Sequence, residues 1–332
     1  MKWGIVIFFL ALFFSKGYSQ VAPLQEQQLE SFAEQNADVE TEDDSYQQQM
    51  EQFRRDPVNM NEVDEILLHE LKILSDLQVR QFLVYRRLLG KFLSIYELQA
   101  IPGWDLNTIK RLLPYIRVGN INNSTETFSR RVKGGQHILL LRLSQVLEKS
   151  LGYSTNPVTG SAPYPGSPQR VLLRYKYGYK NLLQYGITAE KDPGEQFFKG
   201  SRKSGFDFYS AHVCFRKLGF IKTMLVGDYT VNMGQGLIQW QTMAFGKGAE
   251  VLNVKRQSAV IRPYTSVNEI NFHRGIAMTV GKKYWEYSIF VSAKKIDANY
   301  QPADSAMPFK RVTSFQTSGY HRQKNEIDDR AS

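Results

Sequence analysis

The side chains that perform catalysis or bind metals are sparse and scattered in this sequence of 332 residues. Neither metal-ligand spacing nor a cysteine cluster accompanies the five histidines, which are His69, His137, His212, His273 and His321. The acids of "EKDPGE" (190–195) flank a Pro-Gly turn, which is typical of a surface loop rather than of a calcium site or a catalytic carboxylate pair. "GQG" at 234–236 and "GKG" at 246–248 lack the Gly-Lys-Ser/Thr ending of a phosphate loop and favour ordinary turns. We therefore expect no enzyme activity, no cofactor and no metal site.

The amino terminus has the features of a secretory signal. Lys2 precedes an apolar run from Trp3 to Phe14, and small residues follow as far as Ser19. The run is too short and wrongly flanked for a spanning helix, although a short membrane anchor is the alternative. We expect export and cleavage after Ser19. The lone Cys214 provides no internal disulfide, and its neighbours "AHVCF" predict a packed strand position.

Charge is distributed unevenly along the chain. Residues 20–65 contain thirteen acids and two arginines, a net charge of −11, whereas residues 66–332 contain 38 basic and 19 acidic side chains, a net charge of +19. Blocks of this kind are typical of solvated faces or tails. Residues 20–56 are rich in Gln, Glu and Asp and poor in apolar side chains, which predicts a flexible or loosely helical spacer ending at Asp56-Pro57.

Residues 58–118 have the pattern of short amphipathic helices. The apolar stripe of the first helix is Val63, Ile66, Leu67 and Leu71. The predicted helix starts are Asn61, the capping boxes Ser75–Gln78 and Ser94–Glu97, and Asp105. Gly90 and Pro114 mark helix ends. Four or five helices joined by turns of two to four residues predict a compact helical unit.

Beyond Arg130 the sequence changes to a period of two. In "RVLLRYKYGYK" the apolar or aromatic positions are Val171, Leu173, Tyr175, Tyr177 and Tyr179. Charged side chains, among them Arg174 and Lys176, point the other way. In "FIKTMLVGDYTVNMG" we expect Ile221, Leu225, Val231 and Met233 to share the apolar face. Alternation over ten to twelve residues predicts long strands with one apolar and one polar face.

The length of these strands separates two classes of β protein. A soluble β-sandwich also alternates, but its strands are typically about five or six residues long. Strands near ten residues, abundant Tyr and Phe, and an export signal together favour a transmembrane barrel. Lipid would then contact the Leu, Val and Tyr side, and Arg174 and Lys176 would face a wet lumen. A secreted soluble sandwich with a helical docking domain stays the alternative.

Residues 58–116 resemble, without a gap, the tandem helix-hairpin-helix domain of ComEA-like competence proteins. The matching positions are Val58, Asn59, Asn61, Leu71, Tyr85, Arg86, Gly90, Phe92, Ser94, Leu98, Gly103, Leu112, Pro114 and Tyr115. The whole layout is similar to a family of exported proteins that join this domain to a predicted outer-membrane barrel. The segments "GYKNLLQYGITAEKDPGE", "GFDFYSAHV", "GDYTVNMGQGL" and "AFGKG" resemble that barrel, and the resemblance extends to about Tyr320.

In the DNA-binding form of the domain, the resemblance implies two glycines in each hairpin, which let backbone N–H groups at the next helix start approach a phosphate. The first hairpin here has Ile73 and Ser75 at those places. The second keeps Gly103 but has Asp105, whose carboxylate accepts the same N–H groups and repels phosphate. Residues 57–118 contain eight Lys or Arg and seven Asp or Glu, a net charge of only +1. We therefore expect weak or no DNA affinity.

The resemblance leaves a set of residues that could still contact nucleic acid. They are Gly103, Trp104, Asn107, Lys110, Arg111, Arg80, Arg86 and Arg87. The predicted function is a non-enzymatic Gram-negative envelope protein, with a barrel in outer-membrane lipid and a helical domain that meets an unidentified periplasmic partner. An exported DNA-binding protein involved in DNA uptake is the alternative.

The predicted domains are the signal peptide 1–19, the acidic flexible spacer 20–56, the tandem helix-hairpin-helix domain 57–118, the linker 119–130 and the partial β-barrel 131–332. The fold class is thus a small all-α domain followed by an antiparallel transmembrane-type β-barrel. The polar ending "HRQKNEIDDRAS" offers no terminal aromatic strand, and the resembled family continues past this point. We therefore expect an incomplete, truncated barrel whose edge strands are unpaired.

Overall fold

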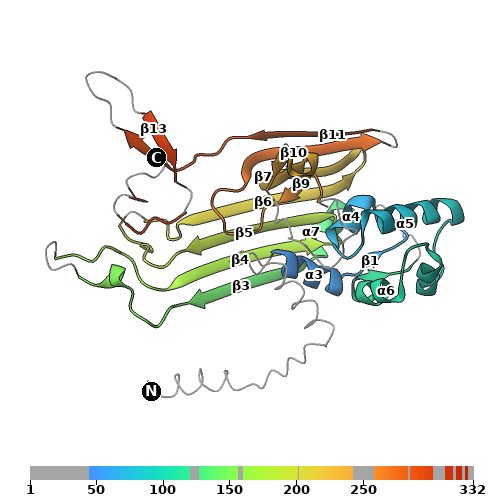
Figure 1. Cartoon of the computed structure of the whole chain (residues 1–332), viewed down its shortest axis with the longest axis horizontal. Helices are drawn as coiled ribbons and strands as arrows, with labels where there is room; N and C mark the ends of the chain where they lie inside the picture. The colour runs from blue at the N-terminus through green and yellow to red at the C-terminus, as the bar shows by residue number, and fades with distance from the viewer. Residues whose placement is uncertain are drawn as a thin grey trace, which may run out of the picture. The chain divides into compact units, whose positions relative to one another are not determined.

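A nine-stranded antiparallel sheet and a group of short helices make up this computed structural model (Figure 1). The structure describes residues 45–119, 127–155, 160–200, 202–241, 258–282, 285–301, 311–316, 319–323 and 326–327, without the side chains of 45–48, 300 and 301. All of these residues belong to one compact unit. The predicted signal, the predicted spacer up to residue 44 and "GKG" lie outside the described residues. The expected combination of helices with an antiparallel sheet is confirmed.

Most helices are short and lie before the sheet in the sequence. They are α3 (Ser45–Arg55), α4 (Glu65–Glu70), α5 (Asp76–Leu89), η1 (Ile95–Ala100), α6 (Leu106–Leu112), η2 (Leu113–Tyr115), α7 (Phe128–Lys133), η3 (Leu151–Tyr153) and η4 (Gly234–Gly236). No described helix is both long and apolar enough to cross a membrane. We call residues 45–119, which include α3 to η2, the helical unit.

Apolar side chains at helical spacing give the helical unit its own core. Leu68, Leu71 and Phe82 are fully buried there, and Phe82 stacks on Phe92 with ring centroids 5.4 Å apart. Two short parallel strands, β1 (Val58–Asn59) and β2 (Ile116–Arg117), pair the beginning of the unit with its end. The helices therefore form one packed layer rather than a string of separate turns.

The predicted spacer, expected to be flexible or loosely helical, ends in the ordered helix α3, whose Met50 and Phe53 belong to the core because these two side chains bury their apolar surface against it. One expectation for the helical unit is wrong. Asn61 was to start the first helix, but Asp64 caps α4 and accepts the Leu67 N–H. The Asn61 amide instead donates to the carbonyl of Phe92 at 2.9 Å and accepts its N–H at 2.8 Å.

The main sheet has the strand order β11-β10-β7-β6-β5-β4-β3, with β8 and β9 paired to β7. Its strands are β3 (Gln136–Ser144), β4 (Arg170–Tyr179), β5 (Leu183–Lys191), β6 (Phe208–Leu218), β7 (Ile221–Met233), β8 (Gln239–Trp240), β9 (Ile261–Pro263), β10 (His273–Lys282) and β11 (Trp285–Ser292). A separate pair is β12 (Ala298–Gln301) with β13 (Arg311–Phe315). Among the described strands, β3 and β11 each pair on one side only, so the sheet is open and the described strands do not close a barrel.

The register sorts the side chains of the sheet into an apolar and a polar face. One row of directly paired residues is His137, Tyr177, Tyr185, Val213, Val226, Ile276 and Val291. The adjacent row on the other face is Ile138, Lys176, Gly186, His212, Gly227, Gly275 and Ser292. Because side chains alternate along a strand, these rows extend into two faces with opposite chemistry.

The four side chains expected to share the apolar face of β7, Ile221, Leu225, Val231 and Met233, do not share one face. Ile221 pairs with Val280 and lies on the apolar face, but Leu225 pairs with Ala277 and Cys214 and lies on the polar face. The register with β10 shifts between these positions, and an extra residue in one strand reverses the facing of all that follows. Leu225 then packs with Val231 and with Ile261 of β9.

The connections of the sheet differ at its two ends. Short turns join β4 to β5 and β6 to β7, and Lys180 and Asn181 adopt positive φ in the first of them. The connections at the opposite end, such as 145–169 and 192–207, are much longer. We call these the short-turn end and the long-loop end.

Candidate functional site

At the two helix starts predicted to have lost phosphate binding, side chains of this chain accept the backbone N–H groups. Ser75 and Gln78 form the predicted capping box at α5, and the N–H of Gln78 donates to the Ser75 hydroxyl at 3.3 Å. Asp105 accepts the Thr108 N–H at 3.2 Å at the start of α6, and the hydrogen bonds with Thr108 hold the pKa of Asp105 below its usual range. Gly103 adopts a left-handed conformation, with φ of 74°. At both helix starts a side-chain oxygen therefore accepts a backbone N–H that an anion would otherwise approach.

The candidate nucleic-acid contacts do not form one exposed surface. Trp104 is buried, stacks on Phe82 and donates its indole N–H to the carbonyl of Gln78. Arg86 donates to the Met60 carbonyl at 2.8 Å and lies over the Phe82 ring. The half-buried Arg111 and the exposed Gly103, Asn107, Lys110, Arg80 and Arg87 complete the set. Two of the eight residues therefore stabilise the helical unit instead of facing a ligand.

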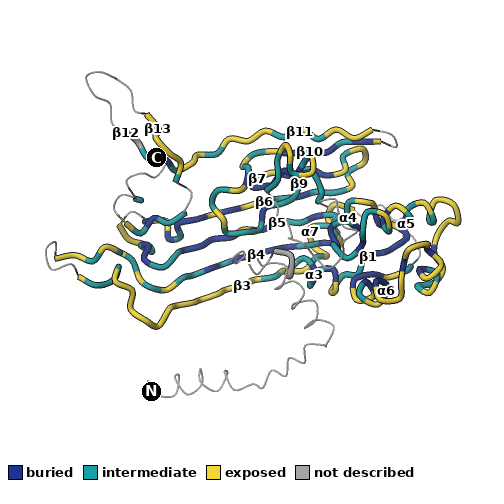
Figure 2. Tube along the Cα trace, viewed as in Figure 1, coloured by how far each residue is buried: buried dark blue, intermediate teal, exposed yellow. Residues whose placement is uncertain are grey.

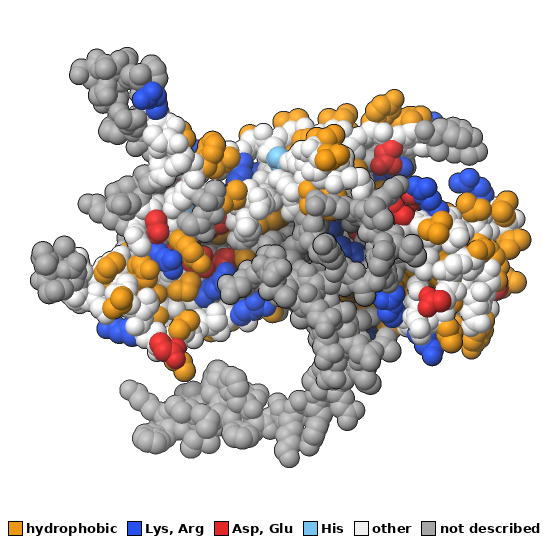
Figure 3. Space-filling view, viewed as in Figure 1, with side chains coloured by type: hydrophobic (Ala, Val, Ile, Leu, Met, Phe, Trp, Pro, Cys, Tyr) orange, Lys and Arg blue, Asp and Glu red, His pale blue; other side chains and the backbone are white. Residues whose placement is uncertain are grey.

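Over part of the sheet the burial of the side chains is opposite to that of a soluble protein, and Figure 2 shows where buried and exposed residues lie along the strands. On the polar face Arg174, Lys176 and His212 are at most 8% exposed. On the apolar face Ile276 is 53% and Val291 70% exposed, and the other exposed apolar side chains include Leu139, Leu141, Leu143, Ile187, Tyr287 and Ile289. In Figure 3 hydrophobic side chains are exposed along the edge of the sheet where β10 and β11 lie. A soluble sheet buries its apolar face and leaves polar side chains in water.

The helical unit contacts the sheet at the short-turn end through a buried ion pair. Arg216, near the end of β6, donates twice to the carboxylate of Glu70, at 2.9 and 3.2 Å. Gln49 donates to the same carboxylate at 3.1 Å and accepts from Arg262 at 2.7 Å. Burial would raise the pKa of Glu70, but the charges of Arg216 and Arg262 outweigh it and lower the pKa. Glu70 is therefore an ionised carboxylate whose side chain is 2% exposed.

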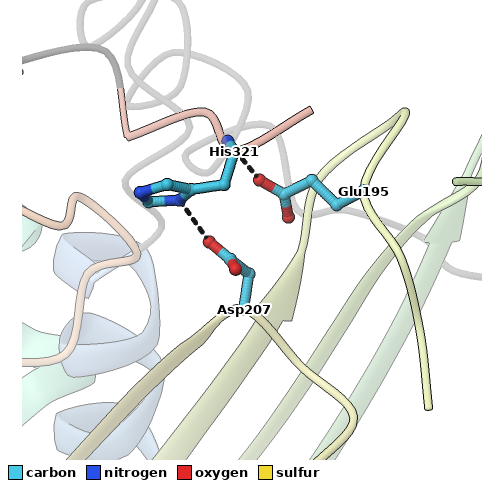
Figure 4. A group of neighbouring side chains, drawn as sticks. All are labelled: Glu195, Asp207 and His321. Atoms are coloured by element: carbon cyan, nitrogen blue, oxygen red, sulfur yellow. Dashed lines mark hydrogen bonds and ion pairs between the residues drawn. The ribbon is translucent and has the colours of Figure 1, made fainter. Parts of the chain in front are cut away.

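A second set of ionisable side chains meets at the long-loop end. We call Glu195, Asp207, Glu269, Asp297 and His321 the loop cluster. His321 Nδ1 lies 2.6 Å from Asp207, and the His321 backbone N–H donates to Glu195 at 2.9 Å (Figure 4). His321 Nε2 lies 2.9 Å from Asp297. Glu195, Asp207 and His321 are all buried.

Glu195, Asp207 and His321 have the spacing of metal ligands, because one ligand atom from each lies within 4.8 Å of the others. A different chemistry fits their contacts better. An imidazole that donates to two carboxylates from both of its nitrogens is an imidazolium, and the raised pKa of His321 favours this form. Arg202, 4% exposed, forms an ion pair with Asp207. Two cations thus already occupy the carboxylates, so the cluster is an ion-pair network that joins four loop segments.

The pKa values of the loop cluster predict how it responds to pH. Burial would lower the pKa of His321, but its hydrogen bond with Asp297 and the charges of Glu269 and Asp297 raise the pKa above 6.5. A raised histidine pKa stabilises the folded state below pH 6.5, and this stabilisation is lost as pH rises through the folded pKa. Burial raises the pKa of Glu269 to about 8. This shift also makes the folded state less stable as the pH rises.

We therefore expect residues 319–323 to become less protected from amide hydrogen exchange as the pH rises from 6 to about 9, after correction for intrinsic exchange rates. Replacing His321 with Gln should remove most of this pH dependence, whereas His137→Gln, in β3 and outside the cluster, should leave it unchanged. Equal protection at all pH values in the natural protein would contradict the imidazolium assignment.

Sequence reasoning missed the loop cluster because its members lie far apart in the chain. "EKDPGE" was expected to be an exposed turn, but Glu190, Lys191 and Glu195 are buried. The two predicted turn glycines of "GQG" are confirmed, with φ of 65° and 88°. Cys214 is a buried free thiol in β6, as its neighbours predict. The one signal in the sequence for a buried charge cluster was the mixture of acidic and basic residues at 190–195, between two long predicted strands.

Comparison with family models, with curated proteins and with solved structures found no match to this chain.

Proposed function

We propose that this chain is a non-enzymatic envelope protein whose sheet forms part of an outer-membrane β-barrel and whose helical unit lies in the periplasm. The inverted burial of the sheet carries the proposal. Leaving a Val, Leu or Ile side chain in water rather than in an apolar environment forgoes about 1.5–3 kcal/mol. The row Val226, Ile276 and Val291 leaves three such side chains exposed side by side. Lipid against this face removes that cost.

Strand length and connections agree with this placement. β4, β5, β6 and β10 contain 10, 9, 11 and 10 residues, and a strand of about 9–11 residues spans a bilayer when tilted. Outer-membrane barrels have short periplasmic turns and longer external loops. The helical unit contacts Arg216 and Lys217 at the short-turn end. This favours a periplasmic helical unit, and the polar face would then line the lumen.

Tryptophan quenching by lipid tests the proposal. Trp285 is the first residue of β11 and shares the apolar face with Tyr287, so it suits the aromatic belt of a barrel. Phospholipids brominated near the top of the acyl chain should quench part of the emission of the reconstituted protein. The quenched part should disappear in Trp285→Phe and persist in Trp104→Phe, because Trp104 is buried in the helical unit. Absence of quenching in the natural protein would refute the membrane placement.

The periplasmic role that we propose for the helical unit is protein interaction rather than DNA binding. The capped helix starts and the engaged Arg86 and Trp104 support this choice. An exported DNA-binding protein stays the alternative, because Arg80, Arg87 and Lys110 are exposed. Submicromolar, salt-sensitive binding of duplex DNA by the full chain in a fluorescence-anisotropy titration would favour the alternative.

A further inference from the structure

A cavity of about 150 Å³ lies between α3, the residues that lead into β3, and the end of β4. Its lining residues are Gln52, Arg55, Asp56, Gly134, Gly135, Gln136, Ile138, Lys176, Gly178, Tyr179 and Lys180. The space is large enough for several water molecules, and hence for an ion of the size of phosphate. It is separate from the loop cluster and from the two hairpin turns.

The charges that line this cavity are mostly positive. Arg55, Lys176 and Lys180 contribute three cations, and Asp56 contributes the one carboxylate of the lining. Lys176 is 8% exposed, whereas Arg55 and Lys180 are exposed. Arg55 pairs with Glu51 at 3.0 Å, and the Lys180 ammonium lies 5.4 Å from the Tyr179 ring centroid. The two exposed cations can therefore reorient toward a ligand, while Lys176 is fixed at the cavity wall.

The surroundings of Lys176 increase this excess of positive charge. Arg174 precedes it by two residues on the same face of β4, and Arg216 and Arg262 act on it together with the carboxylate of Glu70. Glu70 is already hydrogen-bonded to Arg216. Like charges gathered away from water repel one another more strongly than on the surface. An anion in the cavity would offset this repulsion.

Glycines and amide side chains complete the cavity wall. Three of the lining residues are glycines, and a Cβ on Gly178 would lie 3.0 Å from the side-chain nitrogen of Gln52. The side chains of Gln52 and Gln136 add amide donors beside the cations. The lining thus offers mainly hydrogen-bond donors, with Asp56 as an acceptor for a protonated oxygen.

From this lining we infer that the cavity binds a small oxyanion of the phosphate class, held by Arg55, Lys176 and Lys180. The same chemistry is found in free phosphate and in a phospholipid headgroup. The inference concerns a site at the junction of α3 with β4 and does not depend on whether the apolar face meets lipid.

Calorimetric titration of the full-length protein in detergent with inorganic phosphate tests this site. We expect saturable binding that weakens at least tenfold in Lys180→Gln and in Arg55→Gln, both exposed positions whose replacement leaves the fold intact. Lys203→Gln, which replaces an exposed lysine in the β5–β6 loop, should bind phosphate like the natural protein.

In a second titration, short-chain phosphatidylglycerol replaces phosphate. Saturation by this lipid alone, lost in the same two variants, would support the site and identify a headgroup as its ligand. Absence of saturable binding in both arms, or equal binding by all four proteins, would overturn the inference.

Discussion

Replacing Glu70 with Ala should lower the free energy of unfolding by about 3–5 kcal/mol, which is the typical cost of removing one partner of a buried ion pair. The reason is the charge left behind. Arg216 keeps its guanidinium with 16% of the side chain exposed, while Arg262 and Lys176 remain near the same point. Urea unfolding of the natural protein and the variant in the same detergent measures the difference.

Two matched variants separate the buried charge from the mere loss of a side chain. Glu51→Ala removes the carboxylate of the exposed pair with Arg55 and should cost at most about 1 kcal/mol. The double replacement Glu70→Leu with Arg216→Met removes both charges of the pair and should restore most of the stability, because neither member is left as a buried charge without the other. If Glu70→Ala unfolded at the same urea concentration as Glu51→Ala, the helical unit would not be docked through this pair.

The pair also gives the stability of the protein a pH dependence opposite to that of the loop cluster. The pKa of Glu70 is lowered, so its contribution is present above the unfolded value of 4.5 and is lost as the pH falls through the folded pKa. The loop cluster loses its contribution as the pH rises. The two ends of the sheet should therefore loosen at opposite ends of the pH scale, and hydrogen exchange can follow each separately.

Local features of the fold could be predicted from the sequence because they depend on residues close together in the chain. The capping boxes at Ser75 and Ser94, the cap at Asp105 and the helix end at Gly90 are all present. Asn61 shows the limit of such reasoning. It has the side chain of a helix cap, but its amide bonds to Phe92 and Gly119, which lie 31 and 58 residues away. A residue's propensity to cap helices does not show whether backbone groups far away in the chain will hydrogen-bond to the same side chain.

The sheet shows the same division between local and distant causes. Alternation predicted the two faces of β4, but it could not place the register shift that reverses Leu225 relative to Ile221. Likewise, the contact between Glu195 and His321 could not be predicted from sequence spacing, because 126 residues separate them. The contact depends on how three loops that carry carboxylates are placed in the folded protein. The polar residues of the sheet could be predicted from the alternation within each strand. The contact of Glu70 with Arg216 could not, because it depends on how the helical unit is placed relative to the sheet.

A single arginine on the apolar face should distinguish lipid from water as its surroundings. Ile289 lies in the middle of β11, pairs with Met278 and is 57% exposed. In a membrane barrel, Ile289→Arg places a charge near the centre of the bilayer and should destabilise the folded protein by about 2–4 kcal/mol. In a soluble sheet the same exposed substitution should change stability by about 0.5 kcal/mol or less.

The neighbouring Ser288 is the matched control, because it lies on the same strand at the same depth and faces the other way. It is half-buried and shares a hydrogen bond of 2.9 Å with Thr279, so Ser288→Arg loses one neutral hydrogen bond, a cost of about 1 kcal/mol. Urea titrations of both variants in lipid vesicles give the comparison. A larger loss for Ile289→Arg is expected only if hydrocarbon covers the apolar face. Equal or reversed losses would mean that the exposed Leu, Ile and Val side chains of this sheet contact water or another protein. The exposure of the apolar face would then require an explanation other than lipid.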